Sequence, residues 1–327
     1  MQYPALGIDV SQLTLVVLLM LADGICQQGT FSNDSKGFAQ LKRWLRRQVD
    51  SPLYVCLEAT GRYSDAIAHD LYAEPWVAQV SVLNPSRIHA YARSHMRRNK
   101  NDKADAWLLA HFAVTQNPAG WRPPSPQQQT LQELMRHRDN LLDARQQVRN
   151  RLSAGVRHEP VQRQLQEQEE LLTRQIDEVE REVQQQIKQD AHLYEQYKLL
   201  CSIPGVGPIL AASFLAEVPD VTFFENAGQL AAYAGLTPTQ HDSGTSVHKK
   251  GKLSKKGNAH LRSALYMPAL CAARYNPLIA AFAARLQANG KAKMTIVAAV
   301  MHKLLRLAYG VLKSGRPFDP NFASLHA

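Results

Sequence analysis

A proline-rich segment near residue 124 constrains most strongly how this chain can fold. The segment Trp121-Arg122-Pro123-Pro124-Ser125-Pro126 fits neither a helix interior nor a central strand, because proline has no N–H to donate to either hydrogen-bond ladder. After it, the composition changes abruptly to Gln, Glu, Arg and Leu. Because 327 residues suffice for about two domains, we expect a domain boundary here.

Before this segment, patterns typical of strands and helices alternate. Residues 5–22 are rich in apolar and β-branched side chains, and a turn at Asp23-Gly24 leads into a short strand at 25–31, which predicts a β-hairpin. Ser35 can cap the helix that follows. Further strands are expected at 53–57 and 77–83, and further helices at 62–72 and after Pro85. The predicted class is mixed α/β with a central sheet.

After the prolines, two long runs carry narrow apolar stripes. In the first, positions 131, 134, 138, 141, 145, 148 and 152 hold Leu, Leu, Arg, Leu, Arg, Val and Leu. The second holds Leu165, Leu172, Ile176, Val179 and Val183. Gly155 and Pro160 interrupt them. Such stripes predict coiled-coil helices that either fold back as an antiparallel hairpin or pair with another chain. From residue 199 to about 312, small apolar residues predict a third, mainly helical region.

The excess positive charge is confined to one C-terminal block. The net charge is +10, yet residues 243–318 hold 14 Lys and Arg and no Asp or Glu. The 24 basic and 28 acidic residues elsewhere leave the remainder at −4. A solvated surface explains a few such charges, but so long a stretch without a carboxylate favours nucleic acid as the partner.

Other features argue against a membrane protein and a disulfide framework. The longest apolar stretch, 13–22, is far shorter than the ~20 residues of a membrane span, and the N-terminus lacks the basic start of a signal peptide. Four widely spaced cysteines form no CxxC pair. We therefore expect a soluble cytoplasmic protein with reduced thiols.

Two carboxylates stand on predicted strands. Asp9 lies inside an otherwise apolar strand, where a buried charge is costly unless it is paired or bound to metal. Glu58 follows the strand 54–57, at the end where open α/β sheets place their sites. Each also has an ordinary interpretation, as a backbone-bonded Asp or a strand-exit Glu.

Two more carboxylates, Asp102 and Asp105, share one face of a predicted helix, where they could simply cap its start. Together with Asp9 and Glu58 they could hold one or two Mg²⁺ ions. Nearby basic residues would balance the charge of phosphates: Arg93, Arg97, Arg98, Lys100 and Lys103. The combination suggests phosphodiester chemistry.

These segments resemble a known family, the transposases of insertion-sequence 110 type. The resemblance to its RuvC-like (RNase H-like) DEDD domain rests on Gly7-Ile8-Asp9, Leu57-Glu58-Ala59-Thr60-Gly61, Asn84-Pro85 and Asn99 to Ala106. The resemblance to its second domain rests on Ile203 to Gly207, Ala234 to Pro238, Ser243 to Ser246, Leu253 to Asn258, Leu261 to Pro268 and Tyr309 to Lys313. The match follows the family's order along nearly the whole chain.

The resemblance implies a DNA recombinase guided by a structured bridge RNA and acting on donor and target DNA. It implies that Ser243 is a nucleophile that forms a covalent phosphoserine link, helped by Mg²⁺ on the four carboxylates. It also implies a homo-oligomer, a dimer that assembles into a tetramer, in a bacterial cytoplasm and on the nucleoid when bound to DNA. From the residues alone, Asp242-Ser243-Gly244 would be a turn. The sequence departs from the family at His248-Lys249-Lys250, where relatives often place an arginine.

Two further features indicate contact with nucleic-acid backbone. The run Ile203 to Gly207 fits a helix-hairpin-helix, in which Gly205 and Gly207 would expose N–H groups to a phosphate, although a tight packing turn fits it too. The densest basic cluster should also contact phosphates: Lys249, Lys250, Lys252, Lys255, Lys256 and Arg262.

The sequence thus predicts three domains: a RuvC-like domain at 1–125, a coiled-coil hairpin at 126–198 and a helical, serine-bearing domain at 199–327. Two alternatives stay open. A metal-dependent nuclease or junction resolvase would use the same carboxylates to activate water and would not need Ser243. A non-catalytic helix-hairpin-helix protein would use the carboxylates only structurally.

Overall fold

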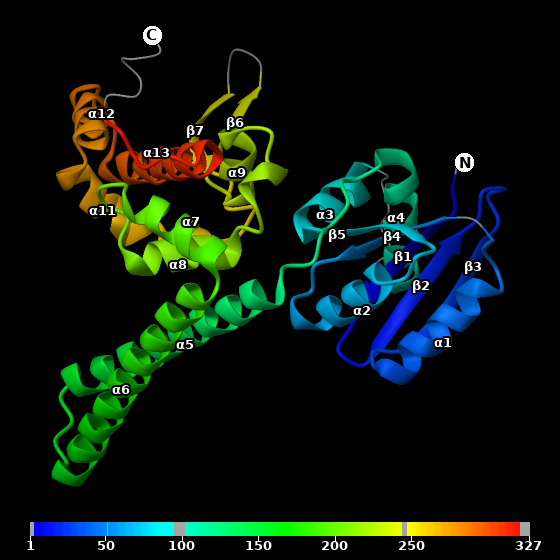
Figure 1. Cartoon of the computed structure of the whole chain (residues 1–327), viewed down its shortest axis with the longest axis horizontal. Helices are drawn as coiled ribbons and strands as arrows, with labels where there is room; N and C mark the ends of the chain where they lie inside the picture. The colour runs from blue at the N-terminus through cyan, green and yellow to red at the C-terminus, as the bar shows by residue number, and fades with distance from the viewer. Residues whose placement is uncertain (1–2, 51, 95–101, 244–246, 321–327) are drawn as a thin grey trace. The chain divides into compact units, whose positions relative to one another are not determined.

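The computed structural model describes residues 3–50, 52–94, 102–243 and 247–320 (Figure 1). The chain divides into two compact units, Met1–Pro123 and Pro124–Ala327. The division falls inside the proline-rich segment. The split of the second unit into two domains stays a prediction.

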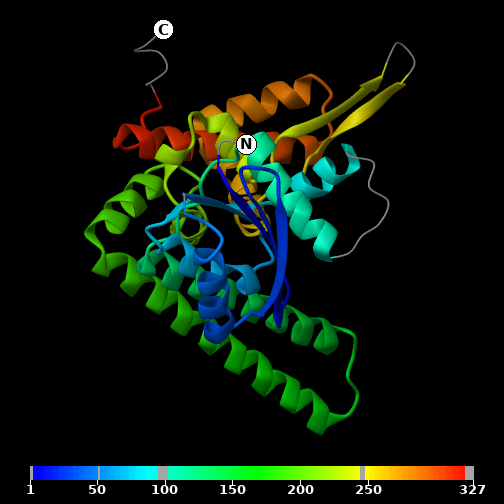
Figure 2. The same ribbon diagram turned by 90° about the vertical axis from the view of Figure 1, so that its right-hand side faces the viewer.

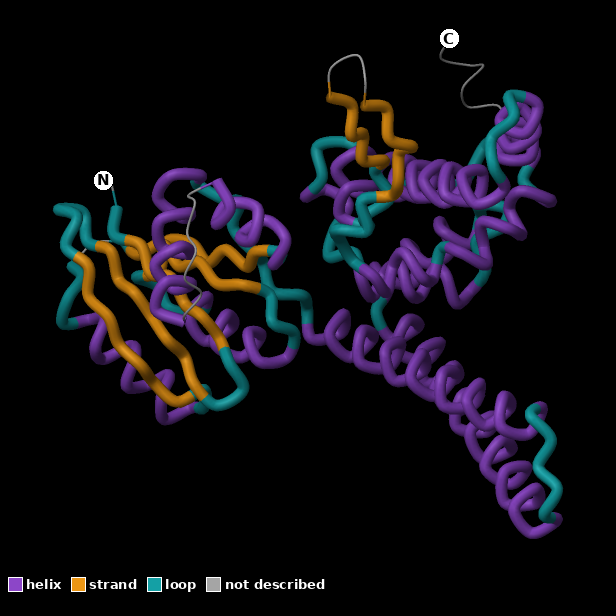
Figure 3. Tube along the Cα trace, turned by 180° about the vertical axis from the view of Figure 1, so that it is seen from behind, coloured by secondary structure: helices purple, strands orange, loops and turns teal. Residues whose placement is uncertain are grey.

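The first unit is built on a five-stranded mixed sheet, seen in orange in Figure 3. Its strands are β1 (Ala5–Val10), β2 (Thr14–Met20), β3 (Cys26–Ser32), β4 (Leu53–Glu58) and β5 (Val77–Leu83). The strand order is β3-β2-β1-β4-β5, antiparallel between β3, β2 and β1 and parallel between β1, β4 and β5. The predicted mixed α/β class with a central sheet is confirmed.

The N-terminal hairpin differs from its prediction. The run 5–22 forms two strands, β1 and β2, because a tight turn breaks it: the N–H of Ser11 donates to the carbonyl of Thr14 at 2.9 Å. Leu13, at the tip of that turn, is 75% exposed. The predicted turn at Asp23-Gly24 joins β2 to β3, with Gly24 at φ 89°.

Helices cover both faces of this sheet. Helices α1 (Ser35–Arg46) and α2 (Arg62–Tyr72) pack on the face that carries Leu6 and Ile8. Helices α3 (Pro85–Ser94) and α4 (Asp102–Gln116) pack on the opposite face. The cap of α1 is Asp34 rather than Ser35, since its carboxylate accepts the N–H of Gly37 at 2.8 Å.

The second unit begins with two long antiparallel helices, α5 (Pro126–Ser153) and α6 (Glu159–Gln189) (Figure 2). Arg138 pairs with Glu180 and Arg149 pairs with Glu169, each at 2.6 Å, which fixes the antiparallel direction. Apolar side chains between the helices form a separate small core: Leu141, Val148, Leu165, Leu172 and Ile176. At the other end, Leu131, Met135, Val183 and Ile187 join the core of the C-terminal helices.

The C-terminal part is mainly helical, as expected. Its helices are α7 (Ala191–Cys201), α8 (Pro208–Glu217), α9 (Ala227–Tyr233), α10 (Ala259–Ala264), α11 (Tyr266–Tyr275), α12 (Pro277–Ala288) and α13 (Lys293–Ser314), with a short 3₁₀ turn, η1 (Val221–Phe223). A two-stranded hairpin, β6 (Pro238–Ser243) and β7 (Val247–Leu253), was not expected.

Helix α13 is, by length and composition, apolar enough to cross a membrane. In the structure it contributes Leu304, Leu305 and Ala308 to the C-terminal core.

Candidate active site and nucleic-acid interface

Asp9 and Glu58 lie at the carboxyl ends of adjacent parallel strands. The register pairs Ile8 with Leu57, so the next residues, Asp9 and Glu58, are neighbours across β1 and β4. Ile8 and Leu57 are buried beneath α1 and α2. Because side chains alternate along a strand, Asp9 and Glu58 belong to the opposite face, which α4 covers.

A glycine in β1 brings α4 unusually close to this face. A Cβ built on Gly7 would lie 2.0 Å from the carbonyl oxygen of Ala106 and 2.4 Å from the N–H nitrogen of Ala110. The backbone of α4 therefore rests directly on β1. Ala110 is two turns from Asp102 and Ala106 is one turn from it, so the three share one helix face.

Helix α4 runs antiparallel to β1, which puts its first turn at the carboxyl edge. Toward the start of β1, Ala5 packs in the cluster that holds Leu109 and Phe112. Farther along, Gly7 meets Ala106. The continuation beyond Gly7 therefore leads toward Asp102 and Asp105, which lie in the first turn of α4. The first turn of α4, with Asp102 and Asp105, is therefore directed toward the edge that carries Asp9 and Glu58.

The described side chains of these carboxylates do not form a metal-binding cluster. Within the described residues, no group of three or more His, Cys, Asp or Glu side chains is arranged to hold a metal ion. A set of four carboxylates nevertheless matches the oxygen ligands that Mg²⁺ prefers. The donor chemistry fits the ion, and the roles of Asp9, Glu58, Asp102 and Asp105 stay predictions.

Several predicted phosphate contacts in the first unit cannot be placed. Arg97, Arg98 and Lys100 lie outside the described residues. Arg93 is exposed on α3, and its Nε donates to the carbonyl of His89 at 3.4 Å.

Ser243 is the last residue of β6, opposite Val247 in β7. Asp242 and Ser243, which were predicted in a turn, are therefore strand residues. Lys249, Lys250 and Lys252 belong to β7, where Lys249 pairs in register with His241 and Lys252 with Thr239. Ser243 and the four carboxylates belong to different compact units.

The other predicted basic contacts follow this hairpin. Lys255 and Lys256 are exposed. One donor of Arg262 is already used within the protein, since its Nη1 donates to the carbonyl of Ala234 at 3.1 Å.

The two glycines of the predicted helix-hairpin-helix differ in their surroundings. Gly205 has φ 98°, and a Cβ there would lie 2.5 Å from the Cβ of Ala272 on α11. This packing gives Gly205 a structural role independent of any ligand. Gly207 is exposed at the N-cap of α8 with nothing within 4 Å of its Cβ position, so it remains open to a phosphate.

A buried carboxylate near the base of the hairpin was missed by the sequence analysis. Glu217 ends α8, and its side chain is 3% exposed. Arg136 of α5 and Asn258, before α10, both donate to it. Its signal in the sequence is a single acidic residue that ends the apolar run 209–216.

The fold and site define the class of this protein: an RNase H-like α/β domain with carboxylates at one sheet edge, followed by a mainly helical domain. Residues 6–159 match the model of the IS110-type DEDD transposases, and residues 197–284 match the family described as "Transposase IS116/IS110/IS902 family".

Relatives agree with this match along the chain. A protein of Moraxella bovis named "Pilin gene-inverting protein" is 35% identical over 318 residues, 96% of this chain and 97% of its own length. The transposase for insertion sequence element IS1111A of Coxiella burnetii is 29% identical over 213 residues, 56% of this chain and 57% of its own length. This chain belongs to the IS110/IS116/IS902 family of transposases.

Proposed function

We propose that this transposase cleaves and rejoins DNA through the hydroxyl of Ser243, assisted by Asp9, Glu58, Asp102 and Asp105, under the guidance of a bridge RNA. The observation that supports the proposal is the contact of Gly7 in β1 with Ala106 and Ala110 of α4, which directs the first turn of α4 toward the strand ends that carry Asp9 and Glu58. Its second support is the position of Ser243 at the end of a strand within a segment that holds no carboxylate up to Phe318.

The carboxylate edge is where a divalent ion would be held. Mg²⁺ bound there would stabilise negative charge that develops on a phosphate. The protein's own contribution is to bring Asp9 and Glu58 from two parallel strands against the first turn of α4. Where the four carboxylates converge, their mutual repulsion would favour a cation between them.

Ser243 would supply the nucleophile. Attack of its Oγ on phosphorus forms an O–P bond and breaks the bond from phosphorus to one sugar oxygen. The serine proton passes to a base, and the departing sugar oxygen leaves as a hydroxyl after taking up a proton. A hydroxyl from a new partner strand can then reverse the reaction, whereas attack by water would leave free ends.

Assembly and guidance complete the proposal. The family resemblance implies that the carboxylate edge of one chain acts with the serine of another, within a dimer that forms a tetramer on RNA and DNA in the bacterial cytoplasm. The pair α5 and α6 is the candidate coiled coil for this assembly, since Val161 and Leu171 are exposed on α6. Exposed Lys255 and Lys256 would bind RNA and DNA phosphates, so binding should weaken steeply as salt rises. Sequencing the RNA that copurifies with the protein tests the guide.

The test of the serine is Ser243→Ala, with Ser263→Ala on the exposed face of α10 as the matched control. With labelled donor and target DNA and the copurified RNA, denaturing electrophoresis should show a protein–DNA adduct for the wild type and the control. The Ser243→Ala variant should bind but form neither adduct nor exchanged strands. Cleavage by this variant, or only free ends from the wild type, would replace the proposal with the metal-dependent nuclease.

A further inference from the structure

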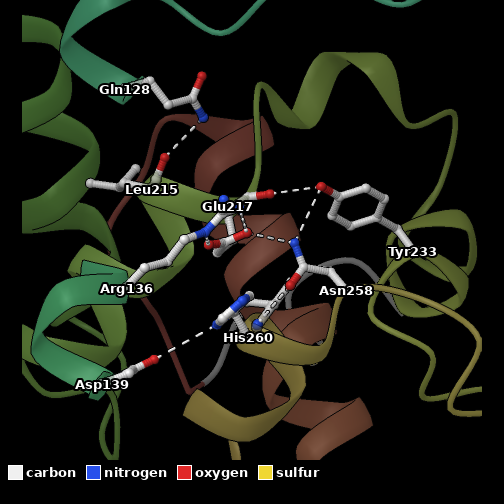
Figure 4. A network of polar contacts seen from close by, with 9 residues as sticks. Gln128, Arg136, Asp139, Leu215, Glu217, Tyr233, Asn258 and His260 are labelled. Carbon is white, nitrogen blue, oxygen red and sulfur yellow. Dashed lines mark hydrogen bonds and ion pairs between the residues drawn. The ribbon is translucent and has the colours of Figure 1, made fainter. Parts of the chain in front are cut away.

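The base of the serine-bearing hairpin is held by a buried polar network centred on Glu217 (Figure 4). Glu217 is 3% exposed, and a carboxylate with so little access to water is costly unless it is paired. Arg136 supplies the pairing charge: its Nε donates to Oε1 at 3.2 Å and its Nη2 to Oε2 at 3.3 Å. The Nδ2 of Asn258 donates to Oε2 at 2.7 Å.

Asn258 connects Glu217 to the segment that follows β7. Its backbone N–H donates to the carbonyl of Tyr233 at 2.7 Å, and its Oδ1 accepts the N–H of Leu261 at 2.9 Å, which caps α10. The hydroxyl of Tyr233 in turn donates to the carbonyl of Glu217 at 2.9 Å. Burial raises the pKa of Tyr233, so this hydroxyl remains a donor. The backbone N–H and both side-chain polar atoms of Asn258 are therefore all hydrogen-bonded.

Two segments that Asn258 joins, 233–237 and 254–258, form the base from which the hairpin rises. The N–H of Ser254 donates to Thr237 at 2.9 Å, and that of Lys255 donates to Gly235 at 3.1 Å. A Cβ on Gly257 would lie 2.3 Å from the carbonyl oxygen of Tyr233, so the two backbones are in direct contact. The first pair of residues in register between β6 and β7 follows directly, and it is Pro238 with Leu253.

The same network reaches the long helix α5. Besides Arg136, Gln128 donates from its Nε2 to the carbonyls of Leu215 at 3.0 Å and Val218 at 2.9 Å, on both sides of Glu217. Asp139 of α5 lies 3.8 Å from the Nδ1 of His260 on α10. Helix α5 thus contacts both the element that carries Glu217 and the element that Asn258 caps.

We propose that Glu217 is a positioning residue that, through Asn258, sets the direction in which the β6–β7 hairpin presents Ser243 relative to α5. This inference rests on the proposed function, since it concerns the presentation of the serine nucleophile. Glu217 itself touches no substrate. Its carboxylate locks the hairpin base against α8 and α5.

The experiment exchanges the donor and the acceptor of the central hydrogen bond. In Glu217→Gln, one of the two acceptor oxygens becomes an NH₂ group that faces a donor of Arg136 or Asn258, and the negative charge that pairs with Arg136 is lost. In Asn258→Asp, two carboxylates face each other at the 2.7 Å contact. In the double variant, the amide oxygen introduced at position 217 can accept from Arg136 while the amide nitrogen donates to the carboxylate introduced at position 258. That carboxylate can still cap α10.

Each single variant should lower the rate of adduct formation per folded molecule by at least about tenfold, because a displacement near 1 Å can cost about 100-fold. The double variant should recover most of that loss. DNA and RNA affinity should stay near the wild-type value in all three. The matched control is Glu169→Gln, which breaks the Arg149 pair on the same helical hairpin and should keep the wild-type rate.

Amide hydrogen exchange gives a second readout that does not depend on the nucleophile. Exchange in 238–243 and 247–253 should accelerate in the single variants and return toward the wild-type rate in the double variant. Wild-type adduct rates in both folded single variants, or unchanged exchange in the hairpin, would overturn the inference. Absence of an adduct from the wild type would instead refute the serine mechanism, and hydrogen exchange would then decide the positioning role alone.

Discussion

The contact between Gly7 and α4 offers the sharpest test of how the carboxylate edge is assembled. In Gly7→Ala, the new methyl group would lie 2.0 Å from the Ala106 oxygen and 2.4 Å from the Ala110 nitrogen, whereas ordinary contact begins at 3.4 Å. Both obstacles are backbone atoms of a helix, so no side chain can rotate away. Helix α4 must therefore retreat by about 1.4 Å, or β1 must shift by a similar distance.

Overpacking of this kind costs about 1 to 3 kcal/mol. For a unit of roughly 120 residues, a loss near 2 kcal/mol lowers the melting temperature by about 8 °C. The retreat also moves Asp102 and Asp105 away from Asp9, and a misplacement near 1 Å can reduce the rate about 100-fold. We expect the larger effect on activity, because the displaced helix carries half of the carboxylates.

The assay combines thermal unfolding with adduct formation measured well below the melting temperature. Gly310→Ala is the matched control: it lies within α13, has nothing within 4 Å of its Cβ position, and should keep the wild-type activity while losing no stability, because alanine favours a helix interior. A Gly7→Ala protein with the melting temperature and adduct rate of the wild type would refute the packing argument.

Two further predictions concern the same unit. Asp9→Asn, Glu58→Gln, Asp102→Asn and Asp105→Asn should each abolish recombination but leave the melting temperature nearly unchanged, because the amides keep shape and lose charge; recombination by Asp9→Asn protein at the wild-type rate would contradict the metal role. Burial raises the pKa of Cys56 to about 12, so its thiol stays protonated and should resist iodoacetamide at pH 8, whereas exposed Cys26 and Cys271 react. Mass spectrometry of labelled peptides checks this, and rapid alkylation of Cys56 in folded protein would contradict the buried position of β4.

Local patterns predicted the sheet well. The β-branched runs and the position of Glu58 at the end of a strand depend on residues close together in sequence, and the structure has strands there. The division of 5–22 was missed because Ser11 interrupts the apolar pattern only briefly, yet its backbone bond to Thr14 is enough to reverse the chain.

Nonlocal contacts could not be predicted. The pairing of Arg136 with Glu217 joins residues 81 apart, and no periodicity in either segment encodes it. Likewise, the approach of β1 to α4 depends on one missing side chain at Gly7 opposite Ala106. The β6–β7 hairpin was missed because its strands are polar and lack the apolar alternation that predicts a sheet.

The helical pair α5 and α6 extends well beyond the contact between Arg136 and Glu217. From Arg136 to Ser153, helix α5 extends about 26 Å at 1.5 Å per residue. A tilt of α5 by about 10° around Arg136 would therefore move the end of the helix at Ser153 by about 4.5 Å. Because Arg136 joins α5 to Glu217, such a tilt would also change the contact at the base of the hairpin that carries Ser243, together with the packing of Leu131 and Met135 in the C-terminal core.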